Sequence, residues 1–202
     1  MEVVSINKAS PNDVSSIVAI HQQAFRNFFL TSLGKDFLEL YYSSFIVSDA
    51  SAVICARRGE ELIGFAACSY RSLGFNKTLI KKHLFRFGIE ALKLLFKNPK
   101  ALIRLAKNLN KEGKNNTIKD LGQYAELYSI AVSPNFQGGG VGRKLLTAIE
   151  ADVKSHNSQI SLTTDYYHND KTIAFYHSMG YNEYYDFVTY PNRRMWRMIK
   201  NI

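Results

Sequence analysis

Cysteine is scarce in this 202-residue chain, which contains only Cys55 and Cys68. The two residues lie in separate apolar stretches, without C-x-x-C spacing and without a nearby pair of histidines. This arrangement favours neither a metal site nor a redox site. We expect both cysteines to be small buried hydrophobic residues, and we predict no metal ion.

Long hydrophobic runs are also missing. No apolar stretch approaches the roughly 18 residues that a membrane-spanning helix needs, and "MEVVSINKASPND" has neither the basic start nor the apolar core of a signal peptide. We therefore expect a cytoplasmic protein. With 46% hydrophobic and 21% charged residues, the composition is typical of a globular chain, and the length suits one domain over residues 1–202 that carries an insertion.

Acidic residues are few in the middle of the chain. Residues 71–119 contain 13 Lys or Arg but only Glu90 and Glu112, a net charge of +11, whereas the whole chain carries +9. Charges recur every three to five residues over 78–98, which predicts a mostly apolar helix with a polar stripe, and Pro99 begins a second amphipathic helix. We predict a basic two-helix insertion at about 72–120 that ends in a polar loop at 110–120.

Strand and helix patterns alternate on both sides of this insertion. Before it, we expect a strand at 3–7, a helix that follows "SPND" and ends near 25, a helix at 35–47 and a hairpin at 52–70. After it, we expect strands at 125–132, 160–165, 181–190 and 193–199, with helices at 141–155 and 171–179. This order predicts a mixed α/β domain.

The stretch "SPNFQGGGVGRKLL" (133–146) joins a strand to a helix through a turn that is rich in glycine. Glycine lets a ligand approach the backbone, and a helix N-terminus offers unpaired N–H groups, so the turn predicts a phosphate site. The dinucleotide fingerprint fails because Arg143 stands where its third glycine should be. The nucleotide P-loop fails because no hydroxyl residue follows Gly142-Arg143-Lys144.

The turn does contain Q-x-x-G-x-G, as Gln137, Gly140 and Gly142, after "V-x-P" at 132–134. Further along, "NDKTIAFYHSMGY" (169–181) places Asn169 seven residues before Tyr176. Together these motifs resemble the GNAT family of acetyl-CoA-dependent N-acetyltransferases, well over 125–181 and in the order of elements over the first 70 residues. The resemblance implies a central twisted, mostly antiparallel sheet flanked by helices.

The resemblance also implies the cofactor site, with acetyl-CoA as co-substrate. Residues Ile130, Ala131 and Val132 match the positions that bind the pantetheine arm. The positions that match the pyrophosphate site are Gln137, Gly138, Gly139, Gly140, Val141, Gly142 and Arg143. Convergent backbone amides and the charge of Arg143 suit two phosphates. Asn169 either contacts the cofactor or caps the short helix that follows it.

The apolar residues of "AELYSIAV" (125–132) depart from strict alternation. Leu127, Ile130 and Val132 are spaced three and then two residues apart, and one extra residue suggests a β-bulge. The corresponding strand of the GNAT family has such a bulge. It would separate this strand from the one at 160–164 and free an N–H for the thioester oxygen.

Tyr176 matches the family's tyrosine that protonates the departing CoA thiolate. For the base that accepts the proton of the amine we favour Glu126, with Asp165, His168 or a chain of waters as alternatives. His21 and His177 are typical of packed or solvated helix residues.

The resemblance places the acceptor near the loop "AFRNFFLTSLG" (24–34), where we expect Phe28, Phe29 and also Tyr166 to bind it. This aromatic loop and the insertion look like the acetyltransferases of bacterial surface-polysaccharide pathways, whose acceptors are nucleotide-linked amino sugars. We therefore predict transfer of acetyl to a primary amine, with such a sugar as the candidate acceptor. The alternatives are a protein or peptide N-acetyltransferase and a CoA-binding, membrane-peripheral module without catalysis.

The basic insertion has three possible roles. Its wide apolar surface favours packing on the domain or on a second copy in a homodimer. Peripheral membrane contact is the second candidate. Nucleic acid binding is not expected, because the charges lie on helices rich in Leu and Phe rather than among stacking aromatics.

Overall fold

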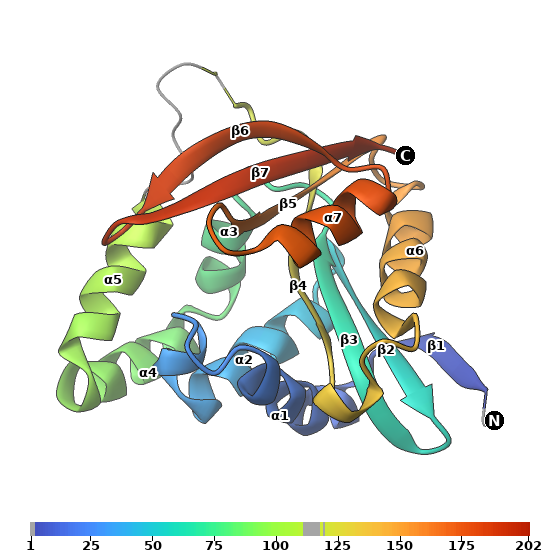
Figure 1. Cartoon of the computed structure of the whole chain (residues 1–202). Coiled ribbons are helices and arrows are strands. Elements are labelled where there is room, and N and C mark those ends of the chain that lie inside the picture. The colour runs from blue at the N-terminus through green and yellow to red at the C-terminus, as the bar shows by residue number, and fades with distance from the viewer. Residues whose placement is uncertain (1–2, 111–117, 119) are drawn as a thin grey trace.

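The computed structural model describes residues 3–110, 118 and 120–202, and a seven-stranded sheet runs through it (Figure 1). In spatial order the strands are β1 (Val4–Lys8), β2 (Ser51–Arg58), β3 (Glu61–Ser69), β4 (Ala125–Val132), β5 (Gln159–Asp165), β7 (Arg193–Asn201) and β6 (Asn182–Thr189). Neighbouring strands are antiparallel except β4 and β5, which are parallel. The mixed, mostly antiparallel sheet confirms the predicted α/β architecture.

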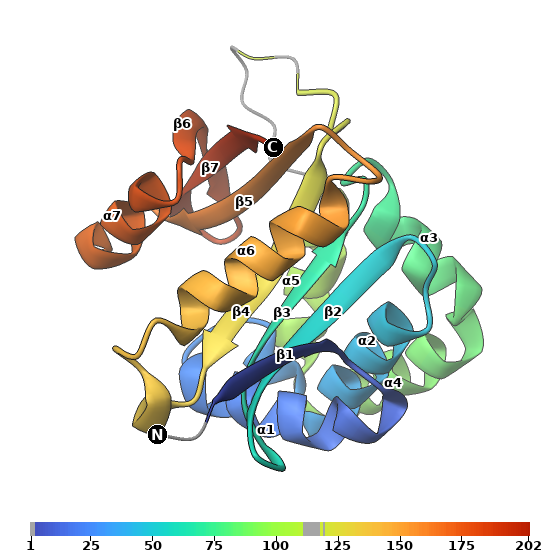
Figure 2. The same cartoon turned by 90° about the vertical axis from the view of Figure 1, so that its right-hand side faces the viewer.

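Helices cover both faces of this sheet. On one face lie α1 (Val14–Ala24) and α2 (Lys35–Ile46), and on the other α6 (Val141–Val153) crosses the middle strands, with α7 (Asp170–Ser178) beside the C-terminal strands (Figures 1 and 2). Short 3-10 turns precede or join these elements at Pro11–Asp13 (η1), Thr31–Leu33 (η2) and Pro134–Phe136 (η3). Cys55 lies in the core under α1 and α2, and Cys68 in the core under α6, so both are buried as expected.

β4 and β5 separate soon after they begin. They pair only over residues 125–127 and 160–162 and then diverge, which Figure 2 shows as a wedge between the two strands. On the other side of β4, Ala67 lies opposite Ser129 while Cys68 lies opposite Leu127, so Tyr128 is an extra residue. The predicted bulge is therefore confirmed, and it occurs where β4 leaves β5.

The insertion differs from the prediction, because it contains three helices rather than two. They are α3 (Phe75–Lys82), α4 (Leu84–Lys97) and α5 (Pro99–Asn110), so the single helix expected over 78–98 was wrong. The break is at His83, whose φ of −119° and ψ of 29° leave the helical region. Its cause is packing: Leu79 of α3 joins the core under α1 and α2, whereas Phe87 and Leu94 of α4 join a separate cluster with α2.

Most of the polar loop expected at 110–120 lies outside the described residues. Among the helices that are described, none combines the length and apolar character needed to cross a membrane.

Gly64 of β3 permits the close approach of α6 to the sheet. A Cβ at this position would lie 2.9 Å from the Ala131 carbonyl oxygen and 3.1 Å from a Leu145 methyl carbon. The first of these atoms is backbone and cannot rotate away. The absence of a side chain therefore fixes the spacing between β3, β4 and α6.

We expect Gly64→Ala to lower the free energy of unfolding by about 1–3 kcal/mol, the usual cost of overpacking a dense core. Gly88→Ala is the matched control, because a Cβ on this exposed residue of α4 meets no atom within 4 Å. Since Ala favours a helix by up to about 1 kcal/mol over Gly, this variant should be unchanged or more stable. Urea unfolding of both variants measures the difference, and equal stability would contradict the packing argument.

Candidate active site

Two adjoining cavities lie along the end of β4 that has separated from β5, and residues of β5 line one of them. The glycine-side cavity, of about 450 Å³, lies against the start of α6, and the aromatic-side cavity, of about 490 Å³, lies against the end of α1 and the loop after it. Residues that line both are Ile130, Ala131, Val132, Gln137, Thr172 and Tyr176. The two cavities therefore share one boundary, which is the end of β4 that is not paired with β5.

The glycine-side cavity is bounded by the predicted phosphate turn. Gly138 and Gly140 have φ of 80° and 74°, and no atom lies within 4 Å of where their Cβ atoms would be. α6 begins at Val141, which is buried and lines this cavity together with Gly142. Gly139, in contrast, does not line the cavity. Open space above a turn at a helix N-terminus is suited to an anion, because free N–H groups and the helix dipole meet there.

Two side chains of the turn are held in place by hydrogen bonds. The Arg143 guanidinium donates to the Ser178 hydroxyl at 3.0 Å, so it lies at the rim between α6 and α7. The Gln137 amide donates to the Val132 carbonyl at 3.1 Å and closes the turn onto β4. Lys144 is exposed and lines neither cavity.

Tyr176 reaches the boundary of both cavities from α7 and is buried. Burial raises the pKa of its phenol to about 12, so the hydroxyl keeps its proton at neutral pH. Asn169 lines the aromatic-side cavity, and its side-chain amide donates to the Thr164 hydroxyl at 2.6 Å and to the Asp165 carbonyl at 3.1 Å. These bonds fix the start of α7 on the end of β5.

Two of the three residues expected at the acceptor are brought together. Phe28 and Phe29 line the aromatic-side cavity, but Tyr166 does not: its ring stacks on Trp196 with centroids 4.7 Å apart. Cations lie over both phenylalanines, with the Arg193 guanidinium 4.6 Å from the centre of the Phe28 ring and Arg104 4.6 Å from that of Phe29.

Arg104, which α5 of the insertion contributes, lines neither cavity itself but lies over Phe29, which does, and its charge is the less well neutralised of these two cations. Arg193 forms a two-bond ion pair with Asp165 at 2.5 and 2.6 Å. Within the described residues no carboxylate lies at ion-pair distance from Arg104, and its Nε is buried without a hydrogen-bond partner. Burial and the charge of Arg193 lower the pKa of Arg104. An anion beside the cavity would satisfy this guanidinium.

His21 is a residue of the aromatic-side cavity that the sequence did not single out as functional. Its side chain lines the cavity although the residue is only 2% exposed. Nδ1 lies 2.7 Å from the Tyr42 oxygen, and the Tyr42 hydroxyl donates to Ser129 at 3.1 Å. With the hydroxyl proton directed at Ser129, these two bonds match the tautomer in which Nδ1–H donates to the Tyr42 oxygen and Nε2 has a lone pair.

No partner for His21 Nε2 exists among the described residues. Burial lowers the pKa of His21 to about 4, so the imidazole is neutral at neutral pH. Its spacing in α1 matches a core residue, and nothing in the sequence alone distinguishes it from one.

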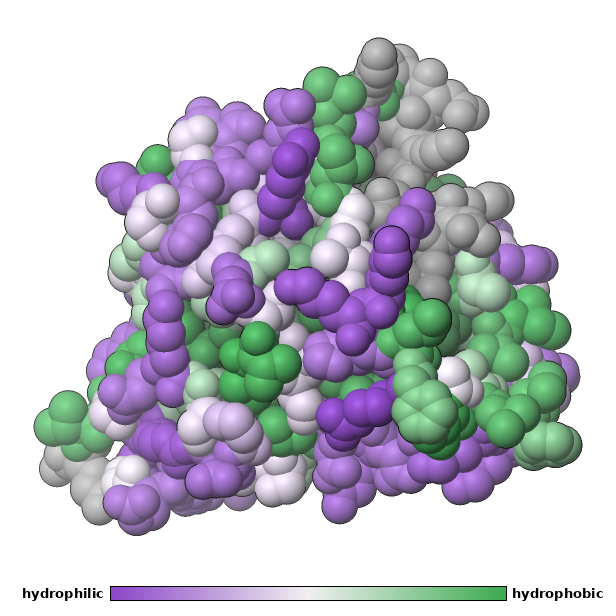
Figure 3. Space-filling model, turned by 180° about the vertical axis from the view of Figure 1, so that it is seen from behind, coloured by the Kyte–Doolittle hydropathy of each residue, from purple (hydrophilic) through white to green (hydrophobic). Residues whose placement is uncertain are grey.

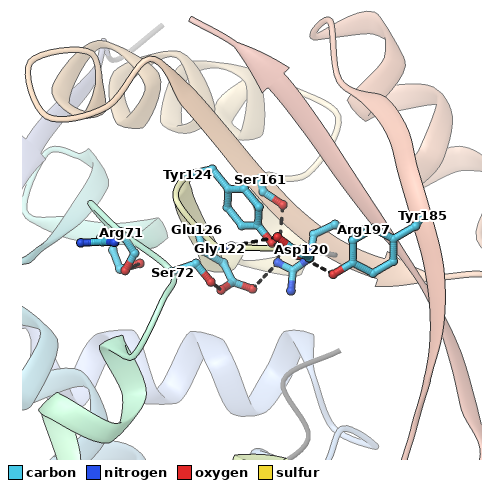
Figure 4. Close-up of polar contacts among 10 residues, drawn as sticks. Arg71, Ser72, Asp120, Gly122, Tyr124, Glu126, Ser161, Tyr185 and Arg197 are labelled. Carbon is cyan, nitrogen blue, oxygen red and sulfur yellow. Dashed lines mark hydrogen bonds and ion pairs between the residues drawn. The ribbon is translucent and has the colours of Figure 1, made fainter. Parts of the chain in front are cut away.

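The other candidate bases lie in different surroundings. Glu126 lines neither cavity, and its carboxylate accepts hydrogen bonds from Arg197, at 2.6 Å, and from Ser72 (Figure 4). Asp165 lines the aromatic-side cavity but is paired with Arg193, and His168 is exposed at a φ of 54° outside both cavities. In the described ranges no cluster of His, Cys, Asp or Glu could hold a metal ion.

Glu126 belongs to a buried polar network at the paired end of β4 and β5. Arg197 of β7 lies between Glu126 and the ring of Tyr124, and Tyr124 and Tyr185 both donate to Asp120 (Figure 4). Burial alone would raise the pKa of Asp120, but these hydrogen bonds, the Gly122 N–H and the charge of Arg197 together hold it below its ordinary value. Both carboxylates therefore already accept hydrogen bonds from neighbouring side chains of the fold.

Comparisons with known proteins agree with this geometry. A model of the acetyltransferase (GNAT) family matches residues 15–181. None of the curated protein sequences is significantly similar to the chain.

Several solved structures share the fold. The ribosomal-protein-S18-alanine N-acetyltransferase of Escherichia coli has 16% identity and a TM-score of 0.61, with 99% of this chain and 94% of that chain covered. A structure described as histone acetyltransferase HPA2 and related acetyltransferase, from Corynebacterium glutamicum, has 18% identity and a TM-score of 0.63, with 100% of this chain and 97% of that chain covered. The PaiA N-acetyltransferase of Thermoplasma acidophilum, solved with coenzyme A, has 13% identity and a TM-score of 0.59, with 99% of each chain covered. The resemblance to surface-polysaccharide enzymes receives no support from these comparisons.

Gly142→Val should abolish the binding of coenzyme A without unfolding the protein. Gly142 has no positive φ, and its Cβ would make ordinary contacts, 3.9 Å from Phe175 and 4.0 Å from Val132. The valine methyl groups would then occupy the glycine-side cavity. For the unmodified chain, coenzyme A at a hundredfold excess over Kd should add about 2.7 kcal/mol of stability, and calorimetry should show no such gain for the variant.

Gly88→Val, on the exposed side of α4, is the control and should keep the full stabilisation by coenzyme A. If Gly142→Val were stabilised as strongly as the control, the ligand would lie elsewhere.

Proposed function

Because the chain belongs to the acetyltransferase (GNAT) family, which uses acetyl-CoA, we propose that it acetylates the primary amine of an anionic small molecule, with a nucleotide-linked amino sugar as the candidate. The observation that carries this proposal is the meeting of the two cavities along Ile130, Ala131 and Val132, beside Tyr176. One cavity suits the cofactor and the other the acceptor, so the reacting groups would meet at this boundary. The transfer is direct and needs no covalent enzyme intermediate.

The residues at the boundary have complementary tasks in this reaction. Acetyl-CoA supplies an activated thioester. The amine nitrogen attacks the thioester carbonyl carbon, a C–N bond forms, and the C–S bond then breaks. A backbone N–H of β4 beyond Leu127, where pairing with β5 has ended, donates to the carbonyl oxygen as its negative charge grows. Tyr176 gives its phenolic proton to the leaving thiolate.

We assign the acceptance of the amine proton to His21 rather than to Glu126. His21 lines the acceptor-side cavity, is neutral, and has a lone pair on Nε2, while Nδ1–H is held by Tyr42. Attack makes the nitrogen more acidic than a free ammonium, and the Nε2 lone pair on the acceptor side can receive its proton, directly or through one water. The proton then passes from His21 to solvent, and the Tyr176 phenolate takes up a proton from solvent, so that both residues are restored for the next turnover.

The acceptor side is aromatic and basic. Phe28 and Phe29 offer ring faces, and Arg104 offers a guanidinium that lacks a carboxylate partner within the described residues. A phosphate or diphosphate would satisfy Arg104, and a sugar or base would pack on the rings. We expect weaker binding of a peptide acceptor, because the aromatic-side cavity, as far as it is described, has no unpaired carboxylate to attract the N-terminal ammonium.

A thiol-release assay with acetyl-CoA tests the acceptor class. We expect turnover with nucleotide-linked amino sugars, and at least about tenfold lower kcat/KM with the same amino sugars without the nucleotide, since one charge-assisted contact contributes about 1.5–3 kcal/mol. Turnover with alanine peptides or polyamines but not with these sugars would overturn the acceptor proposal alone. Binding of coenzyme A without turnover on any amine would favour a module that is not catalytic.

Arg104→Met should raise KM for the anionic acceptor about tenfold and leave KM for acetyl-CoA unchanged. The methionine keeps the apolar contact with Phe29 but removes the charge. Lys100→Met is the control, because this exposed lysine is one helical turn away on α5 and lies over neither phenylalanine ring. Equal KM values for the two variants would remove Arg104 from the acceptor site.

His21→Gln should lower kcat by about 100-fold, the lower range for general acid–base catalysis, with little change in KM for acetyl-CoA. His177→Gln is the matched control, since His177 is exposed and pairs with Glu183 away from both cavities. Melting temperatures of both variants must show a folded protein. A folded His21→Gln variant with unchanged kcat would return the task to Asp165 or to water.

A further inference from the structure

The insertion leaves a large apolar surface uncovered. Phe85 and Phe96 are 81% and 80% exposed, and Leu92 between them is 57% exposed. Because they follow one another at steps of seven and four, they share one side of α4. Phe87 and Leu94, on another side of the same helix, account for its packing on α2 and α5. Attachment to the domain therefore uses one side of α4 and leaves the other open.

More apolar side chains extend this surface. The residues of α4 and α5 that join it are Leu84, Ile89, Leu95 and Ile103, all of them exposed. In Figure 3 hydrophobic side chains gather at the lower right, over the helices of the insertion. We call Leu84, Phe85, Leu92, Leu95 and Phe96, with these neighbours, the insertion surface. An apolar area of this kind on a soluble domain marks a site of interaction.

The helices that carry the insertion surface, and α3 before them, also carry exposed basic side chains. On α3 the exposed lysines are Lys77, Lys81 and Lys82, on α4 Arg86 and Lys97 are exposed, and on α5 Lys100 and Lys107 are exposed. The one acid of these three helices, Glu90, is already paired with Lys93 at 2.7 Å. The charge around the apolar residues is therefore positive and is not balanced within the described part of the insertion.

We propose that the insertion docks on an anionic lipid membrane surface, with α4 lying in the plane of the headgroups. Charge complementarity selects this occupant: a bilayer that contains acidic lipids can take up the apolar side chains and attract the lysines at once. A second copy of the chain would bring an equally basic rim against this one. A nucleic acid would attract the lysines but would leave Phe85, Leu92 and Phe96 in water.

The insertion connects this surface with the acceptor-side cavity. Arg104 of α5 lies over Phe29, which lines the cavity, and Lys107 lies over Tyr190 at the turn between β6 and β7. A membrane-bound enzyme would therefore hold its acceptor cavity close to the lipid surface. The docking itself does not depend on the identity of the acceptor.

Co-sedimentation with vesicles tests the proposal. The full chain should bind vesicles of phosphatidylcholine that contain one third phosphatidylglycerol, and should not bind phosphatidylcholine alone. Raising the salt from about 0.1 M to 1 M shortens the screening length from about 10 Å to about 3 Å and should release most of the protein. Failure to bind the anionic vesicles at low salt would overturn the proposal.

Two double variants separate the apolar and the charged contributions. Phe85→Ser with Phe96→Ser removes apolar area at highly exposed positions, and should weaken vesicle binding at least about tenfold. Lys81→Gln with Lys82→Gln should weaken vesicle binding about 30-fold. Each basic residue near an anionic surface contributes about 1 kcal/mol, and about 1.4 kcal/mol corresponds to a tenfold change in affinity. Melting temperature and acetyl transfer to a soluble amine should be unchanged in both.

Val3→Ser before β1 and Lys154→Gln after α6 are the matched controls, since both residues are exposed and adjoin elements on the side of the molecule away from the insertion (Figure 1). They should bind vesicles as the unmodified chain does. Equal binding by all variants would overturn the proposal, because the vesicles would then contact another surface. A dimer in sedimentation analysis that Phe85→Ser with Phe96→Ser dissociates would also overturn it, in favour of a second copy as the occupant.

Discussion

The separation of β4 from β5 is the constraint on which the site depends. The strands pair over residues 125–127 and 160–162 and then part, and the extra residue Tyr128 changes the direction of β4 at that point. Both cavities, the helix N-terminus that faces one of them and Tyr176 of α7 all lie in or beside the resulting gap. Had the strands remained paired to their ends, ladder hydrogen bonds would occupy the place where two substrates can meet.

A polar network holds the other end of these strands together. Arg197 on β7 binds Glu126 on β4, and the network extends through Tyr124 and Tyr185 to Asp120. Buried charges carry a large desolvation cost, but removal of one partner typically costs about 3–5 kcal/mol because the other is left unpaired. The strands are therefore joined at one end and open at the other, and the gap begins where this network stops.

The sequence predicts the parts of the molecule that depend on local pattern. Three such features are the alternation of the strands, the irregular spacing of Leu127 and Ile130, and the glycine turn before α6. Each depends on residues close together in the sequence, so the sequence alone is enough to predict it. His21 and Arg104 could not be found in this way, because their surroundings come from distant segments: Tyr42 orients the first, and Phe29 stacks on the second. The same reason explains the unforeseen break at His83 and the engagement of Glu126, both of which depend on which cluster or partner a side chain meets after folding.

The common boundary of the two cavities has a consequence for the order of binding. Ile130, Ala131 and Val132 form part of both, so a ligand in the glycine-side cavity supplies surface against which a second ligand packs. Occupation of one cavity then changes affinity for the other, and thermodynamic linkage requires the same factor in both directions. Ordering of this strand by the first ligand would lower the entropic cost for the second. We expect such an enzyme to bind its two substrates cooperatively and to form a ternary complex, rather than to bind them independently.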